Sequence, residues 1–213
     1  MIKNNKFKLI ISSVLILLPI LVGLLLWEKL PEELATHWGA DGSANGWSSK
    51  PFAVLGMPLI LLIIHWICII VTALDPKNKG QNRKVFGLVI WIVPILSIFV
   101  SGIIYTLALG KPIEIETVSL LLIGVLFTAI GNYLPKCKQN HTIGIKIKWT
   151  LEDEGNWNAT HRFCGKLWVA GGLLLMACIF LPKPFMPLIT LIILVALVIT
   201  SFLYSYIYYK RNK

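Results

Sequence analysis

Six long apolar runs constrain what this chain can fold into more than any other feature. None of them contains Asp, Glu, Lys or Arg, and a helix of about 20 apolar residues crosses the hydrocarbon core of a bilayer. Only 14% of the residues are charged, whereas soluble domains have about 25%. We therefore predict an all-α membrane protein with six transmembrane helices. The predicted spans are Leu9–Trp27, Phe52–Leu74, Val85–Leu109, Thr117–Leu134, Leu167–Leu181 and Met186–Tyr208.

Positive charges predict the orientation of these spans. Cytoplasmic loops of membrane proteins are enriched in Lys and Arg, and sixteen of the 20 basic residues share one side if the N-terminus is cytoplasmic. Both termini and the loop Pro135–Lys166 are then cytoplasmic, and Glu28–Pro51 lies outside. We interpret the net charge of +10 as coming from basic residues that set the topology and lie next to lipid headgroups. Membrane lipids are therefore expected partners, and direct nucleic-acid binding is not expected.

The polar segment Ile143–Lys166 is the main candidate for specific recognition. It begins with alternating apolar and basic residues, which predicts a short strand over 143–149 that ends in a helix. Thr150 and Asp153 resemble the N-cap box of that amphipathic helix. The residues that recur on one face of the helix are Trp157, His161, Cys164 and Trp168.

The segment Glu28–Pro51 is the longest one expected outside the cell. It carries turn signals at 41–42 (Asp-Gly) and 45–46 (Asn-Gly). Asp41, Ser43, Asn45 and Gly46 imitate the start of a calcium-binding loop, but Phe52 stands where such a loop needs a glutamate. We expect a structured loop without a metal ion, in which His37 is the candidate for binding a partner.

Polar and small residues inside the spans have mainly structural interpretations. His65 lies near the middle of the second apolar run, and we interpret it as a neutral imidazole hydrogen-bonded to a neighbouring helix, with a functional site as the alternative. Ser97 with Ser101, and Gly124 with Thr128, are spaced four residues apart and predict close helix packing.

Catalytic and metal-binding motifs are absent from the sequence. It contains no nucleophile elbow, Walker loop, H-E-x-x-H or dinucleotide-binding motif, and its four cysteines form no C-x-x-C pair. We expect no enzyme, no metal and no cofactor. A membrane enzyme built on His161, Arg162 and Cys164 is the least favoured alternative.

Several motifs together resemble a known family. Gly144–Leu151 (GIKIKWTL) and the preceding Gly131–Lys136 (GNYLPK) resemble the signature of the SdpI family. The signature continues through Trp157, Thr160, His161, Arg162, Gly165 and Lys166. The residues that resemble the N-terminal module often fused to it are Pro31, His37, Gly42, Gly46 and Lys50. The resemblance implies a first module over 1–84, with two spans and the outer loop, and an SdpI-like module over 85–213, with four spans.

The resemblance also implies a function. SdpI-like proteins are multi-pass immunity proteins of the bacterial cell (inner) membrane that protect against a secreted peptide toxin. Some members also act in signalling and hold a cytoplasmic transcriptional repressor at the membrane. On this hypothesis the partner-binding residues are Trp149, Thr150, Trp157, His161 and Arg162 inside and His37 outside. The alternative is a small polytopic transporter or channel that uses His65.

Overall fold

The computed structural model describes residues 1–212, with Lys79 described by its backbone alone. Lys213 and the Lys79 side chain, both counted among the basic residues above, lie outside the described residues. Within these residues, six helices are long and apolar enough to cross a membrane. The helical spans are Lys3–Leu25, Phe52–Leu74, Arg83–Ala108, Ile115–Lys136, Glu154–Phe180 and Lys183–Arg211. The prediction of six spans is therefore confirmed, and the fifth is longer than its apolar run because the preceding polar helix continues into it.

The chain packs into two compact units. The first contains Met1–Ala73 and Gly87–Glu116, and the second contains Leu74–Phe86 and Thr117–Lys213. The division at residue 84 that the sequence suggested concerns two sequence modules, and it stays a prediction.

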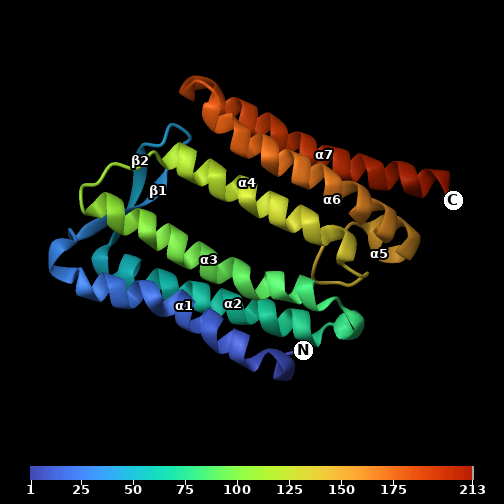
Figure 1. Ribbon diagram of the computed structural model, residues 1–213, viewed down its shortest axis with the longest axis horizontal. Coiled ribbons are helices and arrows are strands. Elements are labelled where there is room, and N and C mark those ends of the chain that lie inside the picture. Colours follow the sequence, from blue (N-terminus) through green and yellow to red (C-terminus); the bar gives the residue numbers. More distant parts are fainter. Residues whose placement is uncertain (213) are drawn as a thin grey trace. The chain divides into compact units, whose positions relative to one another are not determined.

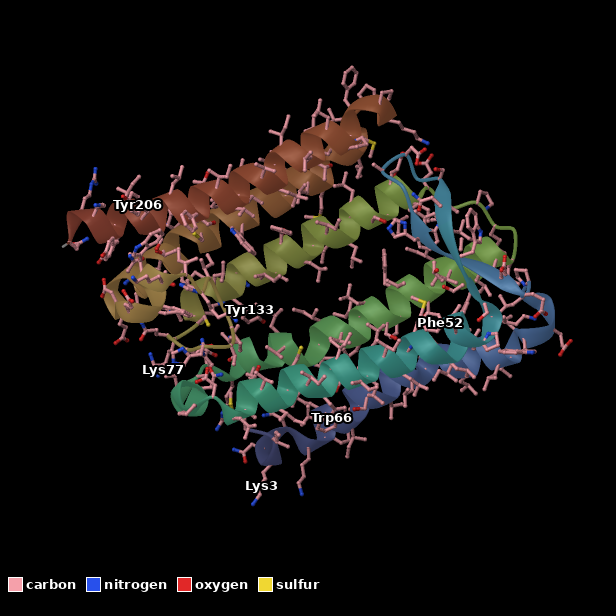
Figure 2. The ribbon with its side chains drawn as sticks, turned by 180° about the vertical axis from the view of Figure 1, so that it is seen from behind. Lys3, Phe52, Trp66, Lys77, Tyr133 and Tyr206 are labelled. Atoms are coloured by element: carbon pink, nitrogen blue, oxygen red, sulfur yellow. The ribbon has the colours of Figure 1, made fainter. Side chains whose placement is uncertain are left out.

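The first unit is a set of helices with a β-hairpin at one end (Figure 1). Its elements are α1 (Lys6–Leu25), β1 (Glu33–Trp38), β2 (Ala44–Ser49), α2 (Met57–Leu74) and α3 (Arg83–Ala108), the last from Gly87 onward. A short π-helical stretch, Phe52–Gly56, leads from the hairpin into α2. Figure 2 shows Phe52 at the hairpin end of this unit and Lys3 at its other end.

Buried hydroxyl groups join the helices of the first unit. The Ser97 hydroxyl donates to the Ile16 carbonyl at 2.9 Å, and the Tyr105 hydroxyl donates to the Pro19 carbonyl at 3.0 Å. Gly23 gives the tyrosine its room, because a Cβ there would lie 2.7 Å from the Tyr105 oxygen. The prediction that Ser97 marks close helix packing is confirmed.

His65 is buried between α1 and α2 and behaves as a packed neutral side chain. Its Nε2 lies 3.0 Å from the Ser12 hydroxyl. That hydroxyl donates to the Leu9 carbonyl at 2.9 Å, so it accepts a hydrogen bond from Nε2–H. Nδ1 finds no hydrogen-bond partner among the described residues. The predicted bond to a neighbouring helix is confirmed.

The second unit begins with the loop Asp75–Asn82 and continues with four helices. These are α4 (Ile115–Tyr133, from Thr117 in this unit), α5 (Lys148–Glu152), α6 (Glu154–Ala177) and α7 (Met186–Arg211). Short 3-10 turns lie at Pro76–Gly80, Leu134–Lys136, Cys178–Phe180 and Lys183–Phe185. Helices α6 and α7 run side by side, and the short α5 lies at one end of them (Figure 1).

Four glycines bring the backbones of α4 and α6 into contact. A Cβ at Gly131 would lie 2.8 Å from the Gly165 carbonyl, and one at Gly172 would lie 2.5 Å from the Gly124 carbonyl. Lipid offers no hydrophobic driving force between helices, so small residues that allow such contact are a main source of association. The prediction that Gly124 and Thr128 mark close packing is confirmed, since a Cβ at Gly172 would also lie 2.6 Å from the Thr128 nitrogen.

We predict that Gly172→Ala destabilises the second unit. The added methyl group would overlap the backbone of α4, and overpacking of this kind costs about 1–3 kcal/mol. Gly102→Ala is the matched control, because a Cβ at Gly102, in α3, meets nothing within 4 Å. Thermal unfolding in detergent, followed by circular dichroism, should show a lower midpoint for Gly172→Ala alone. Equal midpoints for the two variants would contradict the close contact.

Candidate functional site

The stretch before α5 is a turn whose backbone is stabilised by side chains. A strand was predicted over 143–149, and this prediction is wrong: residues 143–147, all described, are not in a strand, and α5 begins at Lys148. A strand needs a neighbour to pair its backbone groups. The two strands of the described chain pair with each other.

Asn140 satisfies the backbone at the start of this turn. Its amide nitrogen donates to the carbonyls of Lys138 at 2.8 Å and Ile143 at 2.9 Å. Its oxygen accepts from the N–H groups of Thr142 at 2.8 Å and Ile143 at 2.6 Å. Asn140 is fully buried, so one side chain supplies the partners that a sheet would otherwise provide.

The loop Asp75–Asn82 holds the same turn from a second direction. Asp75 accepts from the His141 N–H at 2.7 Å. Gln81 donates to the Lys138 carbonyl at 3.1 Å and accepts from the Lys138 N–H at 3.0 Å. The sequence suggested only a basic connection here, so these two residues were missed. Their one signal is that an acidic residue, Asp75, and three amide residues, Asn78, Gln81 and Asn82, lie among the basic residues of this loop.

Two of the predicted site residues hold the peptide groups of Ile145. The Thr150 hydroxyl donates to the Ile145 carbonyl at 2.8 Å, and the Ile145 N–H donates to His161 Nε2 at 3.0 Å. Because Nε2 accepts, the imidazole proton lies on Nδ1, which donates to the Trp157 carbonyl at 2.8 Å. His161 is therefore neutral, and both of its nitrogens are occupied.

Trp157 and Gly144 complete this arrangement. The Trp157 ring stacks on His161 with centroids 4.0 Å apart and planes 18° from parallel, and its Nε1 donates to the Cys137 carbonyl at 2.7 Å. Gly144 lies against the stack with φ +113°, and a Cβ there would lie 2.5 Å from His161 Nε2. Glycine is required both by this backbone conformation and by the lack of space. We call Gly144, Ile145, Thr150, Trp157 and His161 the buried frame.

Helix α6, which follows the short α5, begins later than predicted. Asp153 caps α6, since its carboxylate accepts from the N–H groups of Gly155 at 2.8 Å and Asn156 at 3.1 Å. The prediction that a cap box starts at Thr150 is wrong, because Thr150 lies inside α5 and its hydroxyl bonds Ile145. The carboxylate still satisfies the free amides of a helix start.

Trp149 and Arg162 lie apart from the buried frame. The half-buried Trp149 packs on α7, with its ring centroid 5.1 Å from those of Phe202 and Tyr206 and 5.9 Å from that of Tyr209. Arg162 is exposed. The structure thus brings Thr150, Trp157 and His161 together, places Trp149 beside α7 and leaves Arg162 accessible.

A buried polar contact joins α6 to α7. Asn156 donates to the Ser205 carbonyl at 3.0 Å and accepts from the hydroxyls of Ser205 and Thr160, each at 2.8 Å. All three side chains are fully buried. Sequence reasoning missed this contact. Its signal is a pair of polar residues four apart, Asn156 and Thr160, opposite the small Ser205 in an otherwise apolar run.

The cysteines near His161 show no reactive environment. Burial raises the pKa of the Cys137 thiol to about 11, although hydrogen bonds from Asn140 and Gln81 lower it. Cys164 is fully buried. Both nitrogens of His161 are used by Trp157 and Ile145, so neither is free to act as a base for Cys164. This geometry argues against the enzyme alternative.

The hairpin of the first unit is fixed to its helices. Leu34 is buried in a cluster with Val54, Ile104 and Tyr105. Lys50, 5% exposed, donates to Glu32 at 2.9 Å and to the Trp27 carbonyl at 3.3 Å, and its ammonium lies over the Trp27 ring. The sequence predicted a structured loop with turns, but it did not reveal the two strands.

One face of the hairpin is open. Glu33 pairs with Ser49, Ala35 with Trp47 and His37 with Gly46. The exposed side chains of this face are Glu33, His37, Asn45, Trp47 and Ser49. Trp47 is 58% exposed, and His37 is hydrogen-bonded through Nδ1 to Asn45 Oδ1. This surface, which we call the hairpin face, contains the outer candidate His37.

The tip of the hairpin is closed by its own side chains. Asp41 accepts from the Ser43 hydroxyl at 2.7 Å and the Ser43 N–H at 3.1 Å, and these bonds lower the pKa of its carboxyl. Gly42 has φ +74°, which suits glycine in a turn. Among the described residues, no three His, Cys, Asp or Glu side chains are grouped to hold a metal ion.

Comparison with known proteins identifies the region that contains the buried frame. Residues 136–208 match the model of the SdpI/YfhL protein family. We call these matched residues the SdpI/YfhL region. Residues 14–62, which include the hairpin, match a domain of unknown function, DUF1648. No solved structure matches the chain.

A likeness to one named protein extends over nearly the whole chain. The chain is 28% identical over 204 residues to a protein named Immunity protein SdpI from Bacillus subtilis (strain 168), covering 96% of this chain and 97% of that protein. Together with the six apolar helices, this makes the chain a multi-pass protein of the cell membrane.

We predict that Gly144→Ala opens the buried frame of the SdpI/YfhL region. The methyl group would displace His161 and break its bond to Ile145. Cys137, whose high pKa leaves about one thiol in a thousand ionised at pH 8, should then react with N-ethylmaleimide at least about tenfold faster as it becomes hydrated. Mass spectrometry of the modified peptide measures the rate.

Gly80→Ala is the matched control for this experiment. It makes the same change in the neighbouring loop, where a Cβ would approach only the Lys138 ammonium, at 3.5 Å. If Cys137 reacted equally slowly in both variants, Gly144 would not be needed for the stack.

Proposed function

We propose that this chain is a membrane immunity protein that protects the cell producing it from a secreted peptide toxin. The observation that carries this proposal is the likeness to Immunity protein SdpI across 96% of this chain. That likeness includes both polar regions, the hairpin and the buried frame, as well as all six spans. We propose that the chain acts by binding and not by catalysing a reaction.

The hairpin face is the proposed contact for the toxin. Exposed aromatic side chains on a rigid support often provide much of the binding energy of an interface. Trp47 is such a side chain, and the exposed His37, which is hydrogen-bonded to Asn45, lies opposite Gly46 on the same face. The buried Lys50 and Leu34 hold this face in place, so little order is lost when a peptide binds.

The polar segment is proposed to lie on the cytoplasmic side. Three spans, an odd number, separate it in sequence from the hairpin, so the proposal assigns the two segments to opposite sides of the membrane. The positive-inside rule supports this orientation, with both termini cytoplasmic. Exposed Lys146 and Lys148 lie next to the buried frame, and they suit an inner surface.

Signalling to a cytoplasmic transcriptional repressor is a finer proposal. The partner-binding role suggested for Trp149, Thr150, Trp157, His161 and Arg162 then divides between two kinds of residue. Thr150, Trp157 and His161 hold the shape of the segment, because they are buried. Arg162 is exposed and Trp149 is half-buried against α7, so Arg162 is the more accessible of the two to a partner protein.

We predict that thiol labelling reports this orientation. A cysteine introduced by Ser43→Cys at the hairpin tip should react with a membrane-impermeant maleimide in intact cells. One introduced by Lys146→Cys should react only after the membranes are broken, and the unaltered chain gives the background from its own cysteines. Labelling of Lys146→Cys in intact cells would contradict the proposed orientation.

We predict that removing the gene makes the organism sensitive to its own culture medium. Re-expression of the natural chain should restore growth, whereas the double variant His37→Ala and Trp47→Ala should restore it at least about tenfold less well, as expected for an interface anchor. Survival counts on spent medium measure the effect. Ser49→Ala, on the same face, is the control and should protect fully.

The same strain distinguishes the transporter alternative. That alternative expects His65→Ala to abolish function while changes in the polar segment do not. We expect His65→Ala to keep protection where the protein remains folded. A deletion strain that grows normally in its own medium would overturn the immunity proposal.

A further inference from the structure

A hollow of about 670 Å³ lies along α6 and α7 in the second unit. It is distinct from the buried frame. Its main lining residues are Asn158, Arg162, Phe163, Lys166, Tyr204 and Tyr208. Asn158, Arg162 and Lys166 follow one another at four-residue spacing on α6, and Tyr204 and Tyr208 do so on α7, so each set forms a row on one helix face.

The walls of the hollow combine positive charge with fixed aromatic rings. Phe163 and Tyr204 stack with centroids 4.1 Å apart and planes 5° from parallel. Arg162 and Lys166 are exposed, and no carboxylate of the described residues forms an ion pair with either of them. Two adjacent cations without a counter-ion indicate that the hollow suits an anion.

The position of the hollow along the helices indicates where that anion comes from. The apolar part of α6 starts at Leu167, directly after Lys166, and the apolar part of α7 ends at its tyrosines, just before Lys210 and Arg211. Tyrosines and basic residues at such a boundary lie at the headgroup level of a bilayer. Lipid phosphates are the anions present at that level.

A soluble anion fits the surroundings less well. The exposed acidic residues Glu152, at the end of α5, and Asp153 and Glu154, at the start of α6, precede the hollow, where they repel anions arriving from water. An anionic lipid enters laterally, within the plane of the membrane. Its phosphate then reaches the hollow, and its glycerol and upper acyl carbons contact the rings of Phe163 and Tyr204.

We propose that this hollow binds the phosphate headgroup of an anionic glycerophospholipid. Arg162 and Lys166 contact the phosphate, and the tyrosine hydroxyls of α7 act as further donors. The site does not depend on the proposed immunity function. It gives Arg162 a role in anchoring the end of α6 that lies beside the buried frame.

The test measures lipid binding to the full chain in detergent by native mass spectrometry. Phosphatidylglycerol is titrated into the natural chain and into the double variant Arg162→Gln and Lys166→Gln. Each basic residue near an anionic surface contributes about fivefold to binding, so the double variant should bind roughly thirty-fold more weakly. The matched control is Lys146→Gln with Lys148→Gln, which removes the same charge from exposed positions outside the hollow and should bind as the natural chain does.

Three results would overturn the proposal. These are equal weakening in the two double variants, equal affinity for phosphatidylcholine and phosphatidylglycerol, and displacement of the lipid by soluble glycerol phosphate, which would assign the hollow to a soluble phosphate compound. A second measurement does not depend on the charge variants. A photo-crosslinking amino acid in place of Tyr208 should attach to phosphatidylglycerol, and a crosslink to a cytoplasmic protein without any lipid adduct would assign the hollow to a protein partner instead.

Discussion

The need to pair every backbone polar group away from water governs this structure. In the spans each helix meets this need internally. Where the chain leaves regular structure between α4 and α6, buried side chains meet it instead. Asn140 bonds to both the N–H and the carbonyl of Ile143, and His161 and Thr150 do the same for Ile145. A turn without helix or strand is thus held in one conformation by buried side chains.

This use of polar side chains separates structural residues from accessible ones. A His161 ring whose two nitrogens are occupied has no donor or acceptor left for a partner, and a buried Trp157 ring has no free face. Substitutions there would change function through the fold of the segment. A loss of activity in such variants therefore has meaning only beside a measurement of stability, whereas Arg162, Trp47 and His37 are exposed and report on contacts directly.

The glycine contacts between α4 and α6 connect this turn to the membrane-embedded part of the second unit. The contact of Gly131 with Gly165 lies next to Pro135, whose ring a Cβ at Gly165 would meet at 2.6 Å. Close backbone packing of α4 against α6 thus extends along α6 to Gly165, which lies within the polar segment Ile143–Lys166. Asn156 and Ser205 fasten the same end of α6 to α7. In the first unit, hydrogen bonds from hydroxyl groups, such as that of Ser97 to the Ile16 carbonyl, join neighbouring helices in a similar way.

The sequence by itself determined the six spans and the packing roles of Ser97, Gly124 and His65, because apolar length and helical spacing are local properties. It also contained the motifs that mark the SdpI/YfhL region. Only the tertiary structure decided that residues 143–147 form no strand, that Asp153 caps α6 and that 33–49 form a hairpin. The missing strand and the hairpin depend on strand pairing, which periodicity within one segment does not reveal. The Asp153 cap is a local contact with Gly155 and Asn156, but it followed from the use that the fold makes of Thr150. The alternation in 143–147 had no strand to pair with, and the Thr150 hydroxyl, which could have capped a helix, was used by the carbonyl of Ile145.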